Sequence, residues 1–174
     1  VEAAVSDEIC VGPICLSAGL YEIFITEAHQ RLAVLKEEAA RLAETPGSAV
    51  SEHARRAIHT LAGIAGTTGI AALSELSHAF ELYWNRFSHA ALPVSHLSLV
   101  QDTVVRLHDM VASIERGELP EGANDLIATL GELEDEQTAV AEETAAAAEA
   151  PVPVEAPPVE VAPAPAAPVV AHGL

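Results

Sequence analysis

The fold and the function of this chain are decided by one stretch, Ala57-Ile58-His59-Thr60-Leu61-Ala62-Gly63-Ile64-Ala65-Gly66-Thr67-Thr68-Gly69-Ile70. On a helix that turns about 100° per residue, most of its apolar side chains lie within about 60° of Leu61. His59 lies about 160° from Leu61, with Gly63 and Gly66 on the same side. The stretch therefore predicts an amphipathic helix that buries its leucine and exposes its histidine beside bare backbone.

Amphipathic segments on both sides of this stretch predict a helical bundle. The expected helices cover residues 19–43, 49–67, 70–88 and 95–116, and a shorter one covers 124–133. Ser48 and Ser95 are placed to cap the second and fourth helices, and Gly117 is placed to end the fourth. Short connections between long helices indicate an all-α fold, an antiparallel four-helix bundle over residues 19–133. Phe80, Trp84 and Phe87 are expected in its core.

The two ends of the chain differ from the bundle in composition. Residues 1–18 are expected to form an extended lead-in or a small hairpin around Gly12-Pro13. Cys10 and Cys15, flanked there by apolar residues, are interpreted as small strand hydrophobes rather than as a disulfide. Residues 134–174, acidic and rich in alanine and proline, are expected to be a disordered linker toward another domain. The chain is thus interpreted as an excerpt of a longer protein.

Composition excludes several classes of partner. The 174 residues carry a net charge of −18 and a single lysine, Lys36, which argues against nucleic acids and anionic membranes as partners. No apolar run approaches the roughly 20 residues that span a bilayer, so a cytoplasmic location is expected. The chain is also expected to be a monomeric module.

The histidines do not form a metal-binding motif. The pairs His53/His59 and His89/His96 lack the i, i+4 spacing of a helical metal site, so no metal is expected.

An exposed histidine of this kind suits phosphoryl transfer. A neutral imidazole is a nucleophile that accepts a phosphoryl group on one ring nitrogen. The acceptor nitrogen must be exposed, the other nitrogen must be held as N–H, and the neighbouring backbone must let a partner approach. Position 59 meets the first and third conditions, because Gly63 costs about 1 kcal/mol relative to alanine within a helix without any packing return. From helical geometry alone, an acceptor and a plain surface histidine remain equally good interpretations.

The sequence His59-Thr60-Leu61-Ala62-Gly63, followed by Gly66-Thr67-Thr68-Gly69-Ile70, resembles the phosphorylation-site helix of histidine phosphotransfer (HPt) domains, above all those of CheA-type chemotaxis kinases. That family's usual pattern is His-x-x-Lys-Gly with a downstream Gly-x-x-Gly, and Ala62 replaces the lysine. The resemblance implies that Glu81 hydrogen-bonds the far ring nitrogen of phosphorylated His59, and that His78 flanks the site. It also implies two partners, a histidine-kinase ATP-binding domain that holds Mg-ATP and a response-regulator receiver domain, with no cofactor bound by this chain.

The alanine at position 62 carries two further implications. Together with the lead-in Val11-Gly12-Pro13-Ile14, it resembles the ChpA/PilL hybrid kinases that control type IV pili. It also leaves the positive charge to Arg55 or Arg56, one turn before His59. These two arginines, Ala62, Gly63 and Gly66 are the predicted partner-docking positions.

The predicted function is that of a phosphocarrier, with His59 taking a phosphoryl group from ATP through the kinase domain, or from a receiver aspartate. Because the chain has no glycine-rich nucleotide loop, it is not expected to be an enzyme on its own. Two alternatives stay open: a scaffold or docking module without relay activity, which Ala62 favours, and a plain bundle that pairs with a second copy of itself.

Overall fold

The computed structural model describes residues 7–133. In chain order, its elements are β1 (Glu8–Val11), β2 (Ile14–Ser17), α1 (Ala18–Glu44), α2 (Glu52–Thr68), α3 (Ala71–Asn85), the short 3-10 helix η1 (Val94–His96) and α4 (Leu97–Glu115). A further helix begins at residue 124 and runs to the end of the described residues at 133. The described part is thus mostly helical, as expected. The linker predicted for 134–174 lies outside the described residues.

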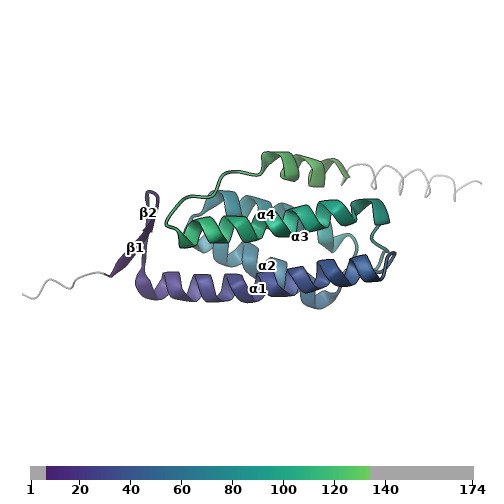
Figure 1. Cartoon of the computed structure of the whole chain (residues 1–174), viewed down its shortest axis with the longest axis horizontal. Helices are drawn as coiled ribbons and strands as arrows, with labels where there is room; N and C mark the ends of the chain where they lie inside the picture. The colour runs from purple at the N-terminus through teal and green to yellow at the C-terminus, as the bar shows by residue number, and fades with distance from the viewer. Residues whose placement is uncertain (1–6, 134–174) are drawn as a thin grey trace, which may run out of the picture.

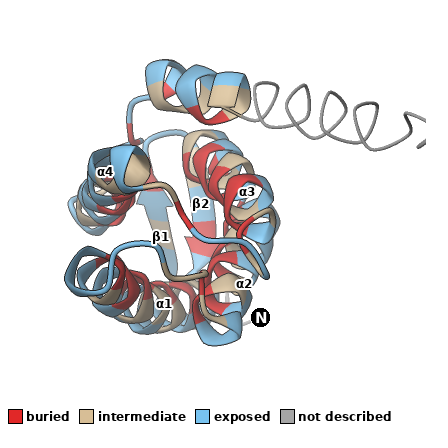
Figure 2. Cartoon of the chain, turned by 90° about the vertical axis from the view of Figure 1, so that its right-hand side faces the viewer, coloured by how far each residue is buried: buried red, intermediate tan, exposed pale blue. Residues whose placement is uncertain are grey.

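The four long helices surround a single core (Figure 1). Helix α2 packs between α1 and α3, and α4 closes the bundle by contacting both α1 and α3. Figure 2 shows the buried residues on the inner faces of these helices. On α3, the rings of Phe80 and Trp84 lie 4.3 Å apart between centroids, and both are fully buried, as their spacing predicted. Ile58 and Leu61 are completely buried on α2, and this packing fixes how α2 is rotated.

Helix α2 begins later than the sequence suggested, because Ser51 rather than Ser48 is its cap. The Ser51 side chain accepts a hydrogen bond from the Ala54 N–H at 3.2 Å. Residues 48–50 instead lie outside the helix, where the Val50 N–H donates to the Phe87 carbonyl at 2.9 Å and the Ser48 carbonyl accepts from the Leu92 N–H at 3.0 Å. The prediction of a Ser48 cap was wrong because these contacts join segments that are distant in sequence.

The ends of α3 and α4 also differ from the predicted ones. Helix α3 stops at Asn85, and the next residues form tighter turns that bury Phe87. The predicted Ser95 cap was wrong, because Ser95 lies within η1 and α4 has no side-chain cap. Gly117 follows the end of α4 with a φ of 77°, as expected of a glycine that ends a helix.

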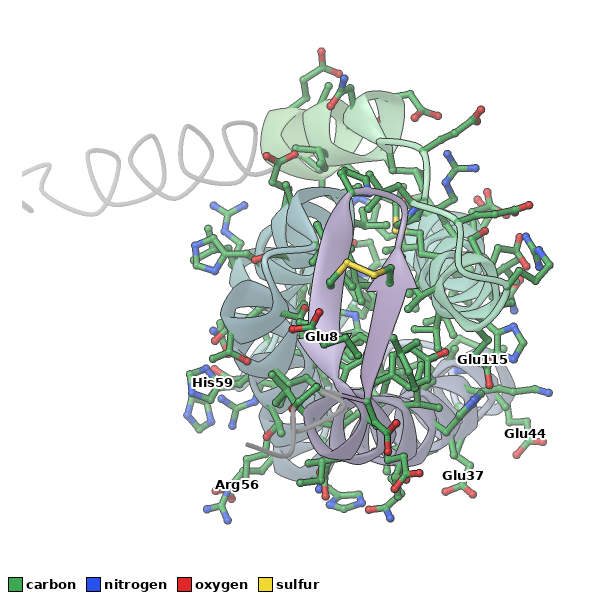
Figure 3. All side chains as sticks on the ribbon, turned by 90° about the vertical axis from the view of Figure 1, so that its left-hand side faces the viewer. Glu8, Glu37, Glu44, Arg56, His59 and Glu115 are labelled. Atoms are coloured by element: carbon green, nitrogen blue, oxygen red, sulfur yellow. A yellow bond between two sulfur atoms is a disulfide. The ribbon has the colours of Figure 1, made fainter. Side chains whose placement is uncertain are left out.

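The hairpin of β1 and β2 lies across one end of the bundle (Figure 1). The antiparallel register places Cys10 directly opposite Cys15, and the two form a disulfide, which Figure 3 shows in yellow. The interpretation of these cysteines as unpaired strand hydrophobes was therefore wrong. Val11 is fully buried, and the Gly12 N–H donates to the Gly117 carbonyl at 3.0 Å, so the hairpin is anchored to the end of α4.

A buried carboxylate, that of Glu38, ties α1 to the start of α2. Its Oε1 accepts hydrogen bonds from the Ser51 N–H at 2.7 Å and from Arg41 Nη2 at 2.6 Å, and its Oε2 accepts from Arg41 Nε at 2.9 Å. Burial alone would raise the pKa of Glu38. The hydrogen bonds from Arg41 and Ser51 outweigh this effect, so the pKa lies below its usual value.

Replacing Glu38 with glutamine is expected to lower the free energy of unfolding at pH 7 by about 1–2 kcal/mol, because charge-assisted hydrogen bonds become neutral ones. A carboxyl whose pKa is lowered by folding stabilises the protein above its unfolded pKa of about 4.3, and this contribution is lost as the pH falls through the folded pKa. Urea unfolding of wild type and Glu38→Gln should therefore differ at pH 7 and converge in acid. Glu37→Gln, at an exposed neighbour, is the control. An equal difference at both pH values would contradict this role.

Candidate functional site

Helices α2 and α3 bring together the two residues expected to carry the chemistry. The His59 side chain is 76 % exposed on the outer face of α2, and in Figure 3 it points away from the bundle. The Glu81 side chain is only 14 % exposed on α3. His59 Nδ1 and Glu81 Oε1 are 2.6 Å apart, so a hydrogen bond links the two helices.

This hydrogen bond selects one tautomer of the imidazole. A carboxylate only accepts hydrogen bonds, so the hydrogen of the neutral ring lies on Nδ1. The lone pair then lies on Nε2, which no group within residues 7–133 hydrogen-bonds. Of the three conditions for a phosphoryl acceptor, the one that helical geometry could not test is that one ring nitrogen is held as N–H, and Nδ1 meets it. Nε2 is then left exposed with the nucleophilic lone pair.

The second oxygen of Glu81 lies near another histidine. Glu81 Oε2 is 3.5 Å from Nδ1 of His78, whose side chain is 64 % exposed one turn earlier on α3. The carboxylate thus stands between two exposed imidazoles, at hydrogen-bond distance from His59 and farther from His78. This placement agrees with His78 as a flanking residue.

A shallow hollow of about 260 Å³ surrounds His59. It is lined by Glu52, Arg55, Arg56, His59, Glu81 and Asn85. Arg56 forms an ion pair with Glu52 one turn earlier. The sequence interpretation missed Glu52 and Asn85, although the spacing of four residues between Glu52 and Arg56, and between Glu81 and Asn85, was a signal for both.

The second arginine of the hollow, Arg55, differs from Arg56 in its interactions. Arg55 is half-buried, and its Nε is buried without a hydrogen-bond partner. Across residues 7–133, no carboxylate pairs with its guanidinium. The hollow therefore contains one guanidinium that is paired with a carboxylate, that of Arg56, and one that is not, that of Arg55.

The surface of α2 beyond His59 is open. A side chain at Gly63 would meet no atom within 4 Å, and one at Gly66 would lie 3.6 Å from the Ser74 hydroxyl. Ala62 is half-buried and brings no charge to the hollow. The backbone one turn after His59 is therefore open to close approach by a macromolecule.

Two kinds of site are missing from the part of the chain that the structure describes. No group of three or more His, Cys, Asp and Glu side chains there is placed to hold a metal ion. None of its helices combines the length and apolar character needed to cross a membrane. The chemical groups that line the hollow are the imidazole, two carboxylates, two guanidinium groups and the Asn85 amide.

Comparisons with known proteins find a matching family model and similar proteins. The family model described as "Hpt domain" matches residues 19–150. Two proteins named "Chemotaxis protein CheA", from Listeria monocytogenes and Listeria innocua, are each 31 % identical to this chain over 123 residues. The alignment covers 68 % of this chain and 19 % of each relative, so the chain spans about a fifth of the length of the curated relatives it matches.

Proposed function

The chain belongs to the Hpt domain family, and on that premise we propose that it is the phosphotransfer module of a CheA-type chemotaxis kinase. His59 carries the phosphoryl group between an ATP-binding kinase domain and a response-regulator receiver domain. The observation that carries this proposal is the 2.6 Å contact of His59 Nδ1 with Glu81, which leaves Nε2 exposed as the nucleophile. Mg-ATP is held by the kinase domain, and this chain is the carrier rather than an enzyme.

The chemistry takes place on Nε2 in two transfers. In the first, the Nε2 lone pair attacks the γ-phosphorus of ATP, the bond from phosphorus to the bridging oxygen breaks, and ADP leaves. The ring becomes positively charged, and Glu81 stabilises that charge through the Nδ1–H. In the second, an aspartate of the receiver domain attacks the phosphorus, and the electron pair of the N–P bond returns to Nε2.

The finer parts of the proposal concern partners and cellular setting. The open surface at Gly63 and Gly66 supports docking of both partner domains against α2. The alanine at position 62 supports placing the module in a ChpA/PilL-type kinase of a type IV pilus system. The strongly acidic balance favours protein partners over nucleic acid or anionic membrane, and we assign the module to the cytoplasm as a monomer.

The proposal is tested by phosphorylation of the 174-residue chain. Incubation with the ATP-binding domain of its kinase and Mg-ATP should yield a phosphate that is stable in base and labile in acid, and mass spectrometry should locate it at His59. Adding the receiver domain should then remove the label from the chain. Absence of labelling, or labelling at another residue, would contradict the proposed function.

Restoring the family's lysine is expected to speed the first transfer. An ammonium near the incoming phosphoryl group contributes up to about 1 kcal/mol at an exposed site, which corresponds to a rate up to about fivefold higher for Ala62→Lys. The measurement is the initial rate of labelling at saturating Mg-ATP. Ala62→Gln, which adds length without charge, is the control, and an equal gain in both variants would show that charge is not the cause.

A further inference from the structure

The site lacks a positive charge at the position where the family places a lysine. A phosphoryl group on Nε2 brings negative charge close to the carboxylate of Glu81, which is already bound to the same ring. Ala62 cannot offset that charge. A phosphoryl carrier with this site therefore needs a cationic group from another position, and the hollow around His59 contains two candidates, Arg55 and Arg56.

The two arginines differ in how they are engaged. Arg56 has a 79 % exposed side chain and is paired with Glu52, so its guanidinium is already engaged by a neighbour. Arg55 is half-buried, its Nε has no hydrogen-bond partner, and no carboxylate in the described residues pairs with it. No carboxylate in the described residues neutralises the Arg55 guanidinium, so its charge is available to an anion bound in the hollow that it lines.

The position of Arg55 on α2 is suited to the acceptor. Residues four apart lie on the same face of a helix, so Arg55 is the neighbour of His59 one turn earlier. The Cα–Cβ bond of His59 tilts toward the N-terminus of α2, on which Arg55 lies one turn earlier. Both side chains line the same hollow.

We propose that Arg55 is the phosphate-binding residue of this domain and replaces the missing lysine from one turn before the histidine instead of one turn after it. This inference rests on the proposed function of His59. The guanidinium donates hydrogen bonds to non-bridging oxygens of the transferring group, to which its planar fork is well matched. It supports both transfers, because the same three oxygens carry negative charge in each.

A small-molecule phosphoryl donor distinguishes phosphate binding by Arg55 from a role of Arg55 in docking a partner domain. With phosphoramidate, the Nε2 lone pair attacks phosphorus, the P–N bond of the donor breaks, and ammonia leaves. No partner domain takes part, so a residue that only contacts the kinase has no effect on this reaction. The experiment compares the rate of His59 phosphorylation by phosphoramidate in the wild-type chain, Arg55→Gln, Arg56→Gln and the double variant Arg55→Gln/Ala62→Lys.

The expected result is that Arg55→Gln lowers the rate about tenfold and that Arg56→Gln lowers it less. The double variant should recover to within about threefold of wild type, because a lysine at position 62 supplies the charge from the other side. A purely structural defect at position 55 would not be repaired by that lysine. Arg116→Gln is the matched control, since Arg116 is paired with Glu118 and directly follows Glu115, which Figure 3 shows on the opposite side of the bundle from His59.

The outcomes separate this inference from the function on which it rests. A wild-type chain that takes no phosphate at His59 from either donor would contradict the proposed function itself. A labelled wild type together with Arg55→Gln labelled equally fast would contradict only the role of Arg55. A loss in Arg55→Gln that Ala62→Lys does not restore would also overturn the assignment.

Discussion

Replacing His59 with glutamine is expected to abolish phosphorylation of the chain, lowering the labelling rate by on the order of a thousandfold or more. A glutamine amide has no nucleophilic nitrogen lone pair to form a bond to phosphorus. The fold should be unaffected, because the His59 side chain is 76 % exposed and so contributes little to the core. Labelling with Mg-ATP and the kinase domain, together with thermal unfolding of the same sample, measures both effects.

A second histidine on α2 provides the control for this experiment. His53 is exposed and does not line the hollow, so His53→Gln should be labelled at the wild-type rate. Labelling of His59→Gln at the wild-type rate would contradict phosphoryl transfer through His59 and favour the scaffold alternative. That alternative predicts that the substitution leaves partner binding and cellular function intact.

Replacing Glu81 with glutamine is expected to slow phosphorylation about 10–100-fold, by analogy with the loss of a carboxylate that orients a metal-binding histidine. Glutamine keeps the size of the side chain but loses the charge that stabilises the phosphorylated ring. Its amide N–H can also donate to Nδ1, which moves the ring hydrogen to Nε2 and blocks the nucleophile. The loss should appear in kcat for the domain as substrate, with KM nearly unchanged.

A direct view of the ring nitrogens makes this prediction specific. Nitrogen NMR of the wild-type ring should show the hydrogen on Nδ1, and the Glu81→Gln spectrum should show a growing share on Nε2. Glu75→Gln, at an exposed position of α3 outside the hollow, should change neither the rate nor the tautomer. An unchanged tautomer and rate in Glu81→Gln would show that the 2.6 Å contact does not orient the acceptor.

The part of the site that lies on one helix was readable from the sequence. The apolar pattern around Leu61 fixes how α2 is rotated, and this alone predicts an exposed His59 beside Gly63. Glu81 is different, because it lies 22 residues away on another helix and no periodicity relates two helices. It was predicted only through the resemblance to HPt domains. The difference between Arg55 and Arg56 also needed the structure, since it depends on which guanidinium finds a carboxylate.

The failed predictions have different physical causes. Ser48 is a good capping residue, but the pairing of its carbonyl with the distant Leu92 keeps residues 48–50 out of the helix, which begins after Ser51. Cys10 and Cys15 were judged by composition, whereas their pairing follows from the hairpin register that places them opposite each other.

Mounting the acceptor and its carboxylate on two regular helices has a kinetic consequence. Neither His59 nor Glu81 lies on a loop, so no closing motion of this chain is needed before the phosphoryl group moves. In the proposed transfer, the acceptor is therefore preorganised before a partner arrives. For an acidic chain of net charge −18, ionic strength then acts on the encounter with a partner, whereas substitutions at His59 and Glu81 act on the chemical step.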